Sequence, residues 1–170
     1  MQLEGSCHCG AVHFRVVSHT TYPFMRCYCT ICRKTAGGGG YAINIMGDAD
    51  TLSVRGRKHV AIYQARLATP GSARRTRSPA QRNFCSVCGS ALWVWDPRWR
   101  EWVYPFASAI DTPLPRPRET QHCLVESKPS WVTLTRGKRD RVFMRFPNEA
   151  IIDWHRKRGL LADGRRKRRT

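Results

Sequence analysis

Short runs of alternating apolar and polar residues recur along most of the chain. In residues 11–17, AVHFRVV, the alternation places Val12, Phe14 and Val16 on one side of a predicted strand. Similar runs, rich in β-branched and aromatic residues, occur at 41–45, 60–65, 91–95, 122–126 and 131–134. Clusters of Gly, Pro, Asp and Ser separate them. The pattern predicts a mainly β domain with irregular loops.

One segment near the C-terminus has a helical pattern instead. Residues 148–158, NEAIIDWHRKR, begin with Asn148 as a candidate N-cap after Pro147 and end before Gly159. We therefore expect a single β domain at 1–146, followed at 147–170 by a short helix and a basic tail.

Length and composition agree with a folded protein. The 170 residues are 41% hydrophobic, which is enough for one domain with a real core. The sequence contains no run of about 18 apolar residues, so we expect no membrane span. The first ten residues, MQLEGSCHCG, lack the layout of a signal peptide, so we expect a cytoplasmic protein with reduced thiols.

In that compartment, eight cysteines indicate metal binding rather than disulfides. In a strand, the two side chains of a Cys-x-Cys pair point to the same face and can converge on one ion. Seven of the cysteines fall in short-spaced sets, namely Cys7/Cys9, Cys27/Cys29/Cys32 and Cys85/Cys88.

Ligand number divides these seven cysteines into four and three, because structural zinc takes four ligands and catalytic zinc takes three with an open position. We predict a structural zinc knuckle formed by Cys7, Cys9, Cys85 and Cys88, with Gly89 turning the backbone. We predict a second zinc at Cys27, Cys29 and Cys32, with Arg33 and Lys34 beside it to offset the charge of three thiolates.

The second site has two interpretations. If its fourth position is open, the zinc can polarise a carbonyl or bind an external thiol. The alternative is a closed site completed by His122 or Cys123. Cys123 alone in a strand pattern is more typical of a buried apolar group, whereas His122 is equally consistent with stabilising charge at the zinc and with a structural role.

Two further features have a structural and a functional interpretation. The glycine run at 37–40 either bends the chain or lets a substrate approach the backbone closely. The tryptophans are mostly typical of a core, but Trp131, after Pro129, is a candidate wall of a pocket.

The net charge of +18 indicates an anionic partner, either nucleic acid, an anionic surface or an anionic small substrate. Five basic residues lie at 165–169 in the predicted tail, and a second basic stretch precedes Cys85 in a predicted loop, SARRTRSPAQR at 72–82. The tail alone is equally consistent with solvated surface charge.

Four segments together resemble the family of glutathione-dependent formaldehyde-activating enzymes, which includes centromere protein V as a relative. They are GSCHCGAVHF, CYCTICRK, RNFCSVCGSALW and HCLVESKPSW, in the order of the family, and VRGRKHVAIYQA is a weaker match. Several features depart from the family pattern, including the four-glycine run and the arginine-rich segment at 74–82. Tyr28 stands where members commonly have His, and Cys123 stands where they commonly have an apolar residue.

The resemblance implies a β-tent-like fold with the same two zinc sites, structural at Cys7, Cys9, Cys85 and Cys88 and catalytic at Cys27, Cys29 and Cys32. It also implies addition of glutathione to formaldehyde, which in reverse is a carbon–sulfur lyase reaction. We expect Arg33 and Lys34 to bind carboxylates of the thiol, Trp131 to contact the aldehyde, and His122 to stabilise the developing alkoxide. The competing hypothesis is an inactive zinc-stapled relative that binds nucleic acid through its basic residues.

Overall fold

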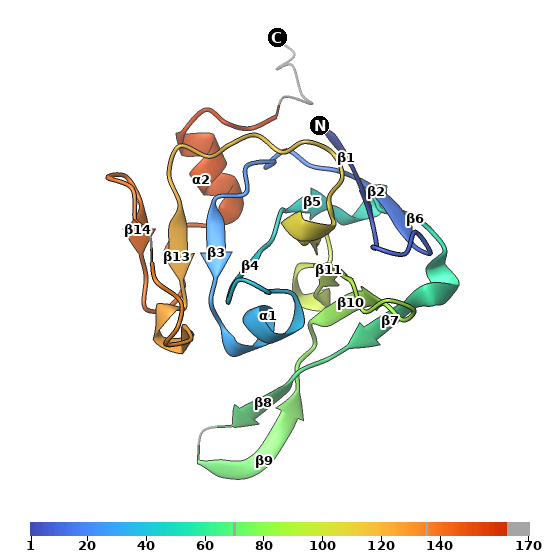
Figure 1. Cartoon of the computed structure of the whole chain (residues 1–170), viewed down its shortest axis with the longest axis horizontal. Coiled ribbons are helices and arrows are strands. Elements are labelled where there is room, and N and C mark those ends of the chain that lie inside the picture. The colour runs from blue at the N-terminus through green and yellow to red at the C-terminus, as the bar shows by residue number, and fades with distance from the viewer. Residues whose placement is uncertain (70, 135, 163–170) are drawn as a thin grey trace.

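The protein, represented by a computed structural model, is built mainly of strands, as the sequence predicts. The structure describes residues 1–69, 71–134 and 136–162. Its strands form three sheets and one separate hairpin (Figure 1). Within the described residues, no helix is long and apolar enough to cross a membrane.

The N-terminal sheet is antiparallel, in the order β1–β2–β6. It consists of β1 (Gln2–Ser6), β2 (His13–Val17) and β6 (Ser53–Arg55). The predicted alternation is confirmed here, because Val12, Phe14 and Val16 are all buried.

The central sheet is also antiparallel, in the order β5–β12–β11–β10–β7. Its strands are β5 (Gly47–Asp48), β12 (Trp102–Pro105), β11 (Ala91–Trp95), β10 (Gln81–Cys85) and β7 (Val60–Tyr63). A register shift between Asn83 and Phe84 interrupts the pairing of β10 with β11, just before Cys85.

The third sheet, in the order β14–β13–β3–β4, joins distant parts of the chain. It contains β14 (Arg141–Val142), β13 (Gln121–Cys123), β3 (Met25–Cys27) and β4 (Ala42–Ile43). Strand β13 is parallel to both β3 and β14, and its register places Cys123 opposite Cys27. These three strands lie side by side in Figure 1.

The helices are short. Helix α1 (Thr30–Thr35) follows β3, and α2 (Ile151–Lys157) packs Trp154 flat on Phe24, with ring centroids 3.7 Å apart. Single 3-10 turns occur at η1 (Ala49–Thr51), η2 (Arg57–His59), η3 (Pro97–Trp99), η4 (Ala107–Ala109) and η5 (Val125–Ser127).

Two clusters of buried residues form the interior. The larger one lies between the N-terminal and central sheets and includes Leu3, Phe14, Ile45 and Trp93. The smaller one contains Cys27, Cys32, Ala42, Phe106 and Cys123. Cys7 and Cys85 belong to the larger cluster, so each predicted zinc site contributes sulfurs to a different core.

Several predicted elements differ in the structure. Residues 131–134 form no strand, because the Val132 N–H donates to the carbonyl of Pro129 and closes a turn. Strand β13 ends at Cys123, since Leu124 has a φ of 57° and the 3-10 turn η5 follows. The strand predicted at 41–45 is reduced to the two residues of β4.

The predicted N-cap at Asn148 is also wrong. Helix α2 begins at Ile151, and Ala150 occupies the N-cap position without a side-chain hydrogen bond. The basic segment predicted to be a loop at 72–82 instead forms β9 (Ser72–Arg77), which pairs with β8 (Arg66–Thr69), and the start of β10. The basic tail at 165–169 lies outside the described residues.

Candidate metal centres

The four-cysteine set, Cys7, Cys9, Cys85 and Cys88, comes together as the sequence predicts. Its four sulfurs lie within 4.8 Å of one another. The Sγ atoms of Cys7 and Cys9 are 3.5 Å apart, and those of Cys9 and Cys85 are 3.8 Å apart. Four thiolates bound tetrahedrally at the usual zinc–sulfur distance would be separated by about 3.8 Å, so this set fits a closed zinc site.

Backbone turns at both ends position these sulfurs. Cys7 follows β1, and its Sγ accepts a hydrogen bond of 3.2 Å from the Val12 N–H. After β10, the Gly89 N–H donates to the Cys85 carbonyl, and Gly89 has a φ of +75° that favours glycine. A hydrogen bond with the Ser90 hydroxyl, followed by backbone N–H contacts, lowers the pKa of the Cys88 thiol to about 5.

The three-cysteine set, Cys27, Cys29 and Cys32, also comes together, with its three sulfurs within 4.8 Å of one another. Cys27 ends β3, Cys29 is the N-cap of α1, and Cys32 lies inside that helix. The Cys29 Sγ accepts a hydrogen bond of 3.3 Å from the Cys32 N–H, so the start of the helix fixes the spacing of two ligands.

The three thiols of this second set interact strongly with one another. Hydrogen bonds from Cys27 and then from Cys32 lower the pKa of the Cys29 thiol to about 2. The pKa of Cys27 is raised, first by a hydrogen bond to Cys123, and the pKa of Cys32 is raised by its hydrogen bond to Cys27. Three thiolates this close together repel one another, and a divalent metal would allow all three to ionise.

Arg82, which was not predicted from the sequence, lies beside this set. Its Nη2 approaches the Cys32 Sγ to 3.8 Å, and its buried Nε has no hydrogen-bond partner among the described residues. Arg82 also lines a mostly apolar cavity of about 370 Å³, together with Thr35 of α1 and Phe106. In the sequence, Arg82 lies three residues before Cys85 of the four-cysteine set. That spacing does not reveal that its side chain lies beside the three-cysteine set instead.

The fourth position of the three-cysteine set has one close candidate. Cys123 is fully buried opposite Cys27, and this confirms the burial predicted for it. Its sulfur nevertheless does not belong to the compact group of three. The structure therefore brings three described Cys sulfurs, and no described His or carboxylate, into this candidate metal site.

His122 lies on the other face of the same strands. The register pairs His122 with Arg26, and alternate residues of a strand point to opposite faces. Its Nδ1 makes a 2.9 Å hydrogen bond with the Tyr28 hydroxyl, inside the Cys27-Tyr28-Cys29 segment. Burial, and then the charge of Arg26, lower the pKa of His122 and favour the neutral ring.

The other predicted substrate residues lie on α1 and beside the glycine run. Arg33 and Lys34 occupy the last turn of α1, where Arg33 is half-buried and Lys34 is exposed. The exposed Trp131 lies next to the glycine run, because a Cβ on Gly40 would be 3.3 Å from its ring. Gly40 has a φ of +82°, so the bend itself requires glycine.

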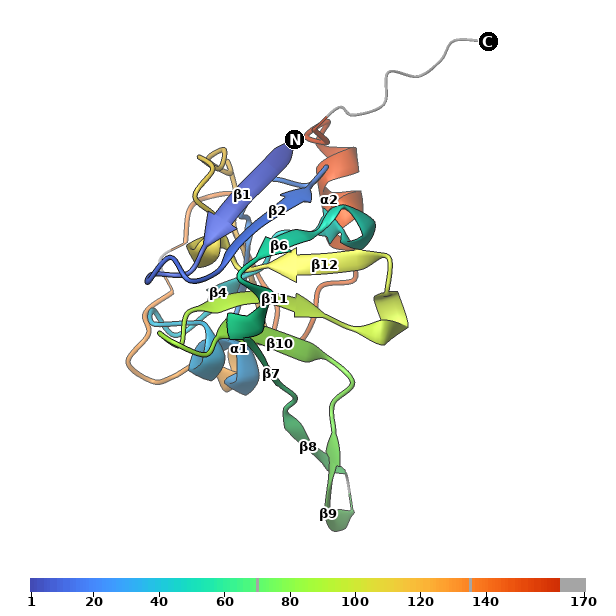
Figure 2. The same ribbon diagram turned by 90° about the vertical axis from the view of Figure 1, so that its right-hand side faces the viewer.

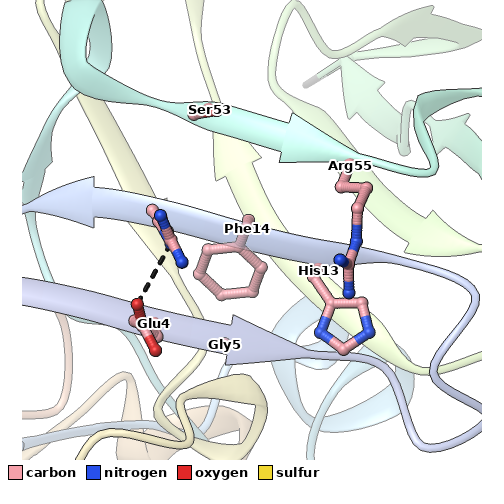
Figure 3. A pocket seen from close by; sticks show the side chains of 7 residues that line it. Glu4, Gly5, His13, Phe14, Ser53 and Arg55 are labelled. Carbon is pink, nitrogen blue, oxygen red and sulfur yellow. Dashed lines mark ion pairs between the residues drawn. The ribbon is translucent and has the colours of Figure 1, made fainter.

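A different cavity, of about 290 Å³, lies on the N-terminal sheet, where Figure 3 shows Glu4, His13 and Arg55 around Phe14. The dashed ion pair in that view joins Glu4 to Arg15 at 3.0 Å. Both of its side chains are largely exposed, and the cavity contains no sulfur ligand. This cavity is therefore separate from the two candidate metal sites.

With this geometry established, comparison with known proteins decides the family. The model of the glutathione-dependent formaldehyde-activating enzymes matches residues 2–124, which include both cysteine sets. The chain belongs to this family.

Two relatives agree with that assignment. A curated protein of Halomonas elongata, provisionally named a glutathione-dependent formaldehyde-activating enzyme, is 60% identical over 160 residues, which cover 94% of this chain and 98% of that protein. A crystal structure of a Rhodobacter sphaeroides protein is 26% identical with a TM-score of 0.50, covering 68% of this chain and 92% of that one. Membership of the formaldehyde-activating family supports a glutathione-dependent enzyme role for the chain.

Proposed function

We propose that this protein is a zinc enzyme that adds a glutathione-like thiol to formaldehyde or another small aldehyde. In this reaction a bond forms between the thiol sulfur and the carbonyl carbon. The thiol proton passes to the carbonyl oxygen, so no oxidant or reductant is needed, and the reverse reaction is carbon–sulfur lysis. The observation that carries the proposal is a set of three thiols that supplies one ligand fewer than a closed zinc site requires.

Zinc fits both cysteine sets because their ligands are thiols grouped at the separations that tetrahedral coordination needs. Cys7, Cys9, Cys85 and Cys88 would hold the structural ion, and Cys27, Cys29 and Cys32 would hold the catalytic one. When bound at the second set, zinc supplies a Lewis acid that lowers the pKa of an incoming thiol. The thiols must stay reduced, which requires a reducing compartment such as the cytoplasm.

Arg82 provides a cation for the carboxylates of the thiol substrate. It lines the cavity beside Cys32, and its buried Nε has no partner among the described residues. A carboxylate bound there would satisfy this donor, and a charge-assisted hydrogen bond is stronger than a neutral one. Arg33 and Lys34 extend the same positive charge along α1 and are candidates for a second carboxylate.

His122, on the opposite face of β13 from Cys123, and the exposed Trp131 are the remaining predicted residues of the proposed site. The alkoxide-stabilising role of His122 remains a prediction, and its hydrogen bond to Tyr28 supports a positioning role. By holding Tyr28, His122 fixes the backbone that separates Cys27 from Cys29. Trp131 beside Gly40 offers an apolar surface for a small aldehyde.

The proposal is tested with Cys29→Ser and Val87→Ser. Formaldehyde consumption in the presence of glutathione is followed by nuclear magnetic resonance, and metal content is measured on the same samples. Cys29→Ser should retain one zinc and lose the enzymatic rate. The exposed Val87 of the knuckle lies outside the proposed site, so its substitution should change neither reading. Full turnover in Cys29→Ser that retained both zincs would contradict the proposal and favour an inactive zinc-stapled relative.

A further inference from the structure

The hairpin of β8 and β9 projects away from the three sheets in both views (Figures 1 and 2). Within the described part of the chain, its two strands pair only with each other. Its base is fixed, because the Ser78 N–H donates to the Ala65 carbonyl at 2.8 Å and the Gln64 amide donates to the Ser78 carbonyl at 2.9 Å. The hairpin is therefore an anchored arm, which we call the arginine arm (residues 66–77).

The arm and the sequence that flanks it carry charge of a single sign. Between Asp50 and Asp96 the sequence contains no acidic residue. The same stretch contains eight Lys or Arg residues, four of which belong to the arm, namely Arg66, Arg74, Arg75 and Arg77. A surface of one sign on a projecting element produces a strong local field for an anionic partner.

The register gathers three of these arginines on one face of the arm. Arg66 lies opposite Arg77, and Ala68 lies opposite Arg75. Since alternate residues and directly opposed residues share a face, Arg66, Arg75 and Arg77 point to the same side. All three side chains are exposed.

This arrangement is unfavourable for the protein alone. Like charges directly opposite each other destabilise a strand pair, and an isolated two-stranded hairpin is marginal in water. Among the described residues, none of these three arginines forms an ion pair with a carboxylate. A bound polyanion would supply the missing counter-charges.

We propose that the arginine arm is a docking surface for the phosphate backbone of double-stranded nucleic acid. A two-stranded ribbon fits the major groove of DNA, and the arginine guanidinium binds phosphate through two parallel hydrogen bonds. A membrane surface fits less well, because Leu67 is the one large apolar side chain of the arm and it is only 39% exposed. This binding does not depend on the proposed enzyme reaction.

The test uses the full-length, zinc-loaded protein and a fluorescently labelled DNA duplex of 20 base pairs, in a salt series followed by anisotropy. The triple variant Arg66→Gln, Arg75→Gln, Arg77→Gln removes three charges from the arm. A control removes the same charge from another exposed segment with Lys138→Gln, Arg139→Gln and Arg141→Gln. Metal content and thermal unfolding confirm that both variants are folded.

If the arm binds phosphates, its variant should weaken binding at least tenfold at 100 mM salt. It should also reduce the slope of log Kd against log salt by about 2.7, since each phosphate contact contributes about 0.9. The control should change both values much less. Equal losses in the two variants would overturn the proposal and leave the arm a solvated surface. It is equally overturned if the arm variant loses binding to vesicles containing phosphatidylserine while its DNA binding is unchanged.

Discussion

At the scale of single residues, the three-cysteine set is organised by its neighbours as much as by its own sulfurs. Cys29 takes its position from the first turn of α1, Cys32 has Arg82 beside it, and Cys27 lies against Cys123. The spacing in the sequence identifies the three thiols. It does not identify Arg82 or the Tyr28–His122 hydrogen bond, because both join segments about 50 or more residues apart.

Arg82 provides a prediction about substrate binding. Replacing Arg82 with Gln should raise the KM for glutathione at least tenfold with a smaller change in kcat, because a charged hydrogen bond contributes about 1.5–3 kcal/mol. Lys58→Gln, which removes an exposed charge elsewhere, should leave KM unchanged. Steady-state kinetics at saturating formaldehyde measures both. An unchanged KM in the Arg82 variant would remove this residue from the binding site.

The Tyr28–His122 pair provides a prediction about stability. Tyr28→Phe removes the phenolic hydroxyl and leaves the buried His122 Nδ1 without its 2.9 Å partner. We expect a loss of about 1–3 kcal/mol in the free energy of unfolding, measured by urea titration of the metal-loaded protein. Tyr104→Phe is a suitable comparison at a half-buried position. An equally small loss in both variants would mean that the hydrogen bond does not position the segment.

At the scale of elements, hydrophobic alternation predicts the strands that lie over a core. β2 shows this directly, because its alternation buries Phe14 and Val16 and exposes Arg15, and β7 and β11 also lie within the expected runs. The sequence is less informative where backbone hydrogen bonds determine the local conformation, as in the turn after Pro129 and at Leu124. Helix α1 has only six residues, too few for a helical period to be recognised.

Helix α2 gives a prediction for the dependence of stability on pH. The His155 Nδ1 lies 2.8 Å from the Ile151 carbonyl, and its Nε2 accepts the Tyr22 N–H at 3.2 Å, so both contacts fit a neutral ring. Burial lowers the pKa of His155 below its usual value. As the pH falls, the unfolded chain therefore binds a proton on His155 at a higher pH than the folded chain does. The contribution of the neutral His155 to the free energy of unfolding is complete above about pH 6.5 and is lost as the pH falls below that value.

His155→Gln isolates this effect. Urea midpoints at pH 7, 6 and 5 should fall less steeply for the variant than for the native protein, although the variant should be less stable at pH 7. Equal slopes for the two proteins would show that His155 has the same pKa in the folded and unfolded states.

At the scale of the whole molecule, the four-cysteine set joins segments that are far apart in the sequence, whereas the three-cysteine set lies within residues 27–32. Cys7 and Cys9 meet Cys85 and Cys88 between the N-terminal and central sheets, and the three-cysteine set lies in the smaller core. Counting ligands in the sequence predicts the division of the seven cysteines into sets of four and three. The strand order of the three sheets, in contrast, depends on packing between distant segments. Metal at the four-cysteine set would therefore stabilise the tertiary structure, and metal at the three-cysteine set would stabilise the local turn from β3 into α1.

Metal removal should consequently lower stability. Incubation with a strong chelator should reduce the midpoint of thermal unfolding by ten degrees or more, because the energy of metal binding is part of the folding energy. Restoring zinc should recover the midpoint, whereas magnesium should not, since thiolates prefer softer ions. A midpoint unaffected by complete chelation would mean that the sheets are stable without the metal.

The most direct test of the account is the zinc content of the reduced, purified protein, measured by elemental analysis against the concentration of chain. The account predicts two zinc ions per chain, one for each cysteine set. A value of one, unchanged in Cys29→Ser, would show that Cys27, Cys29 and Cys32 do not hold a metal and would contradict the proposed chemistry.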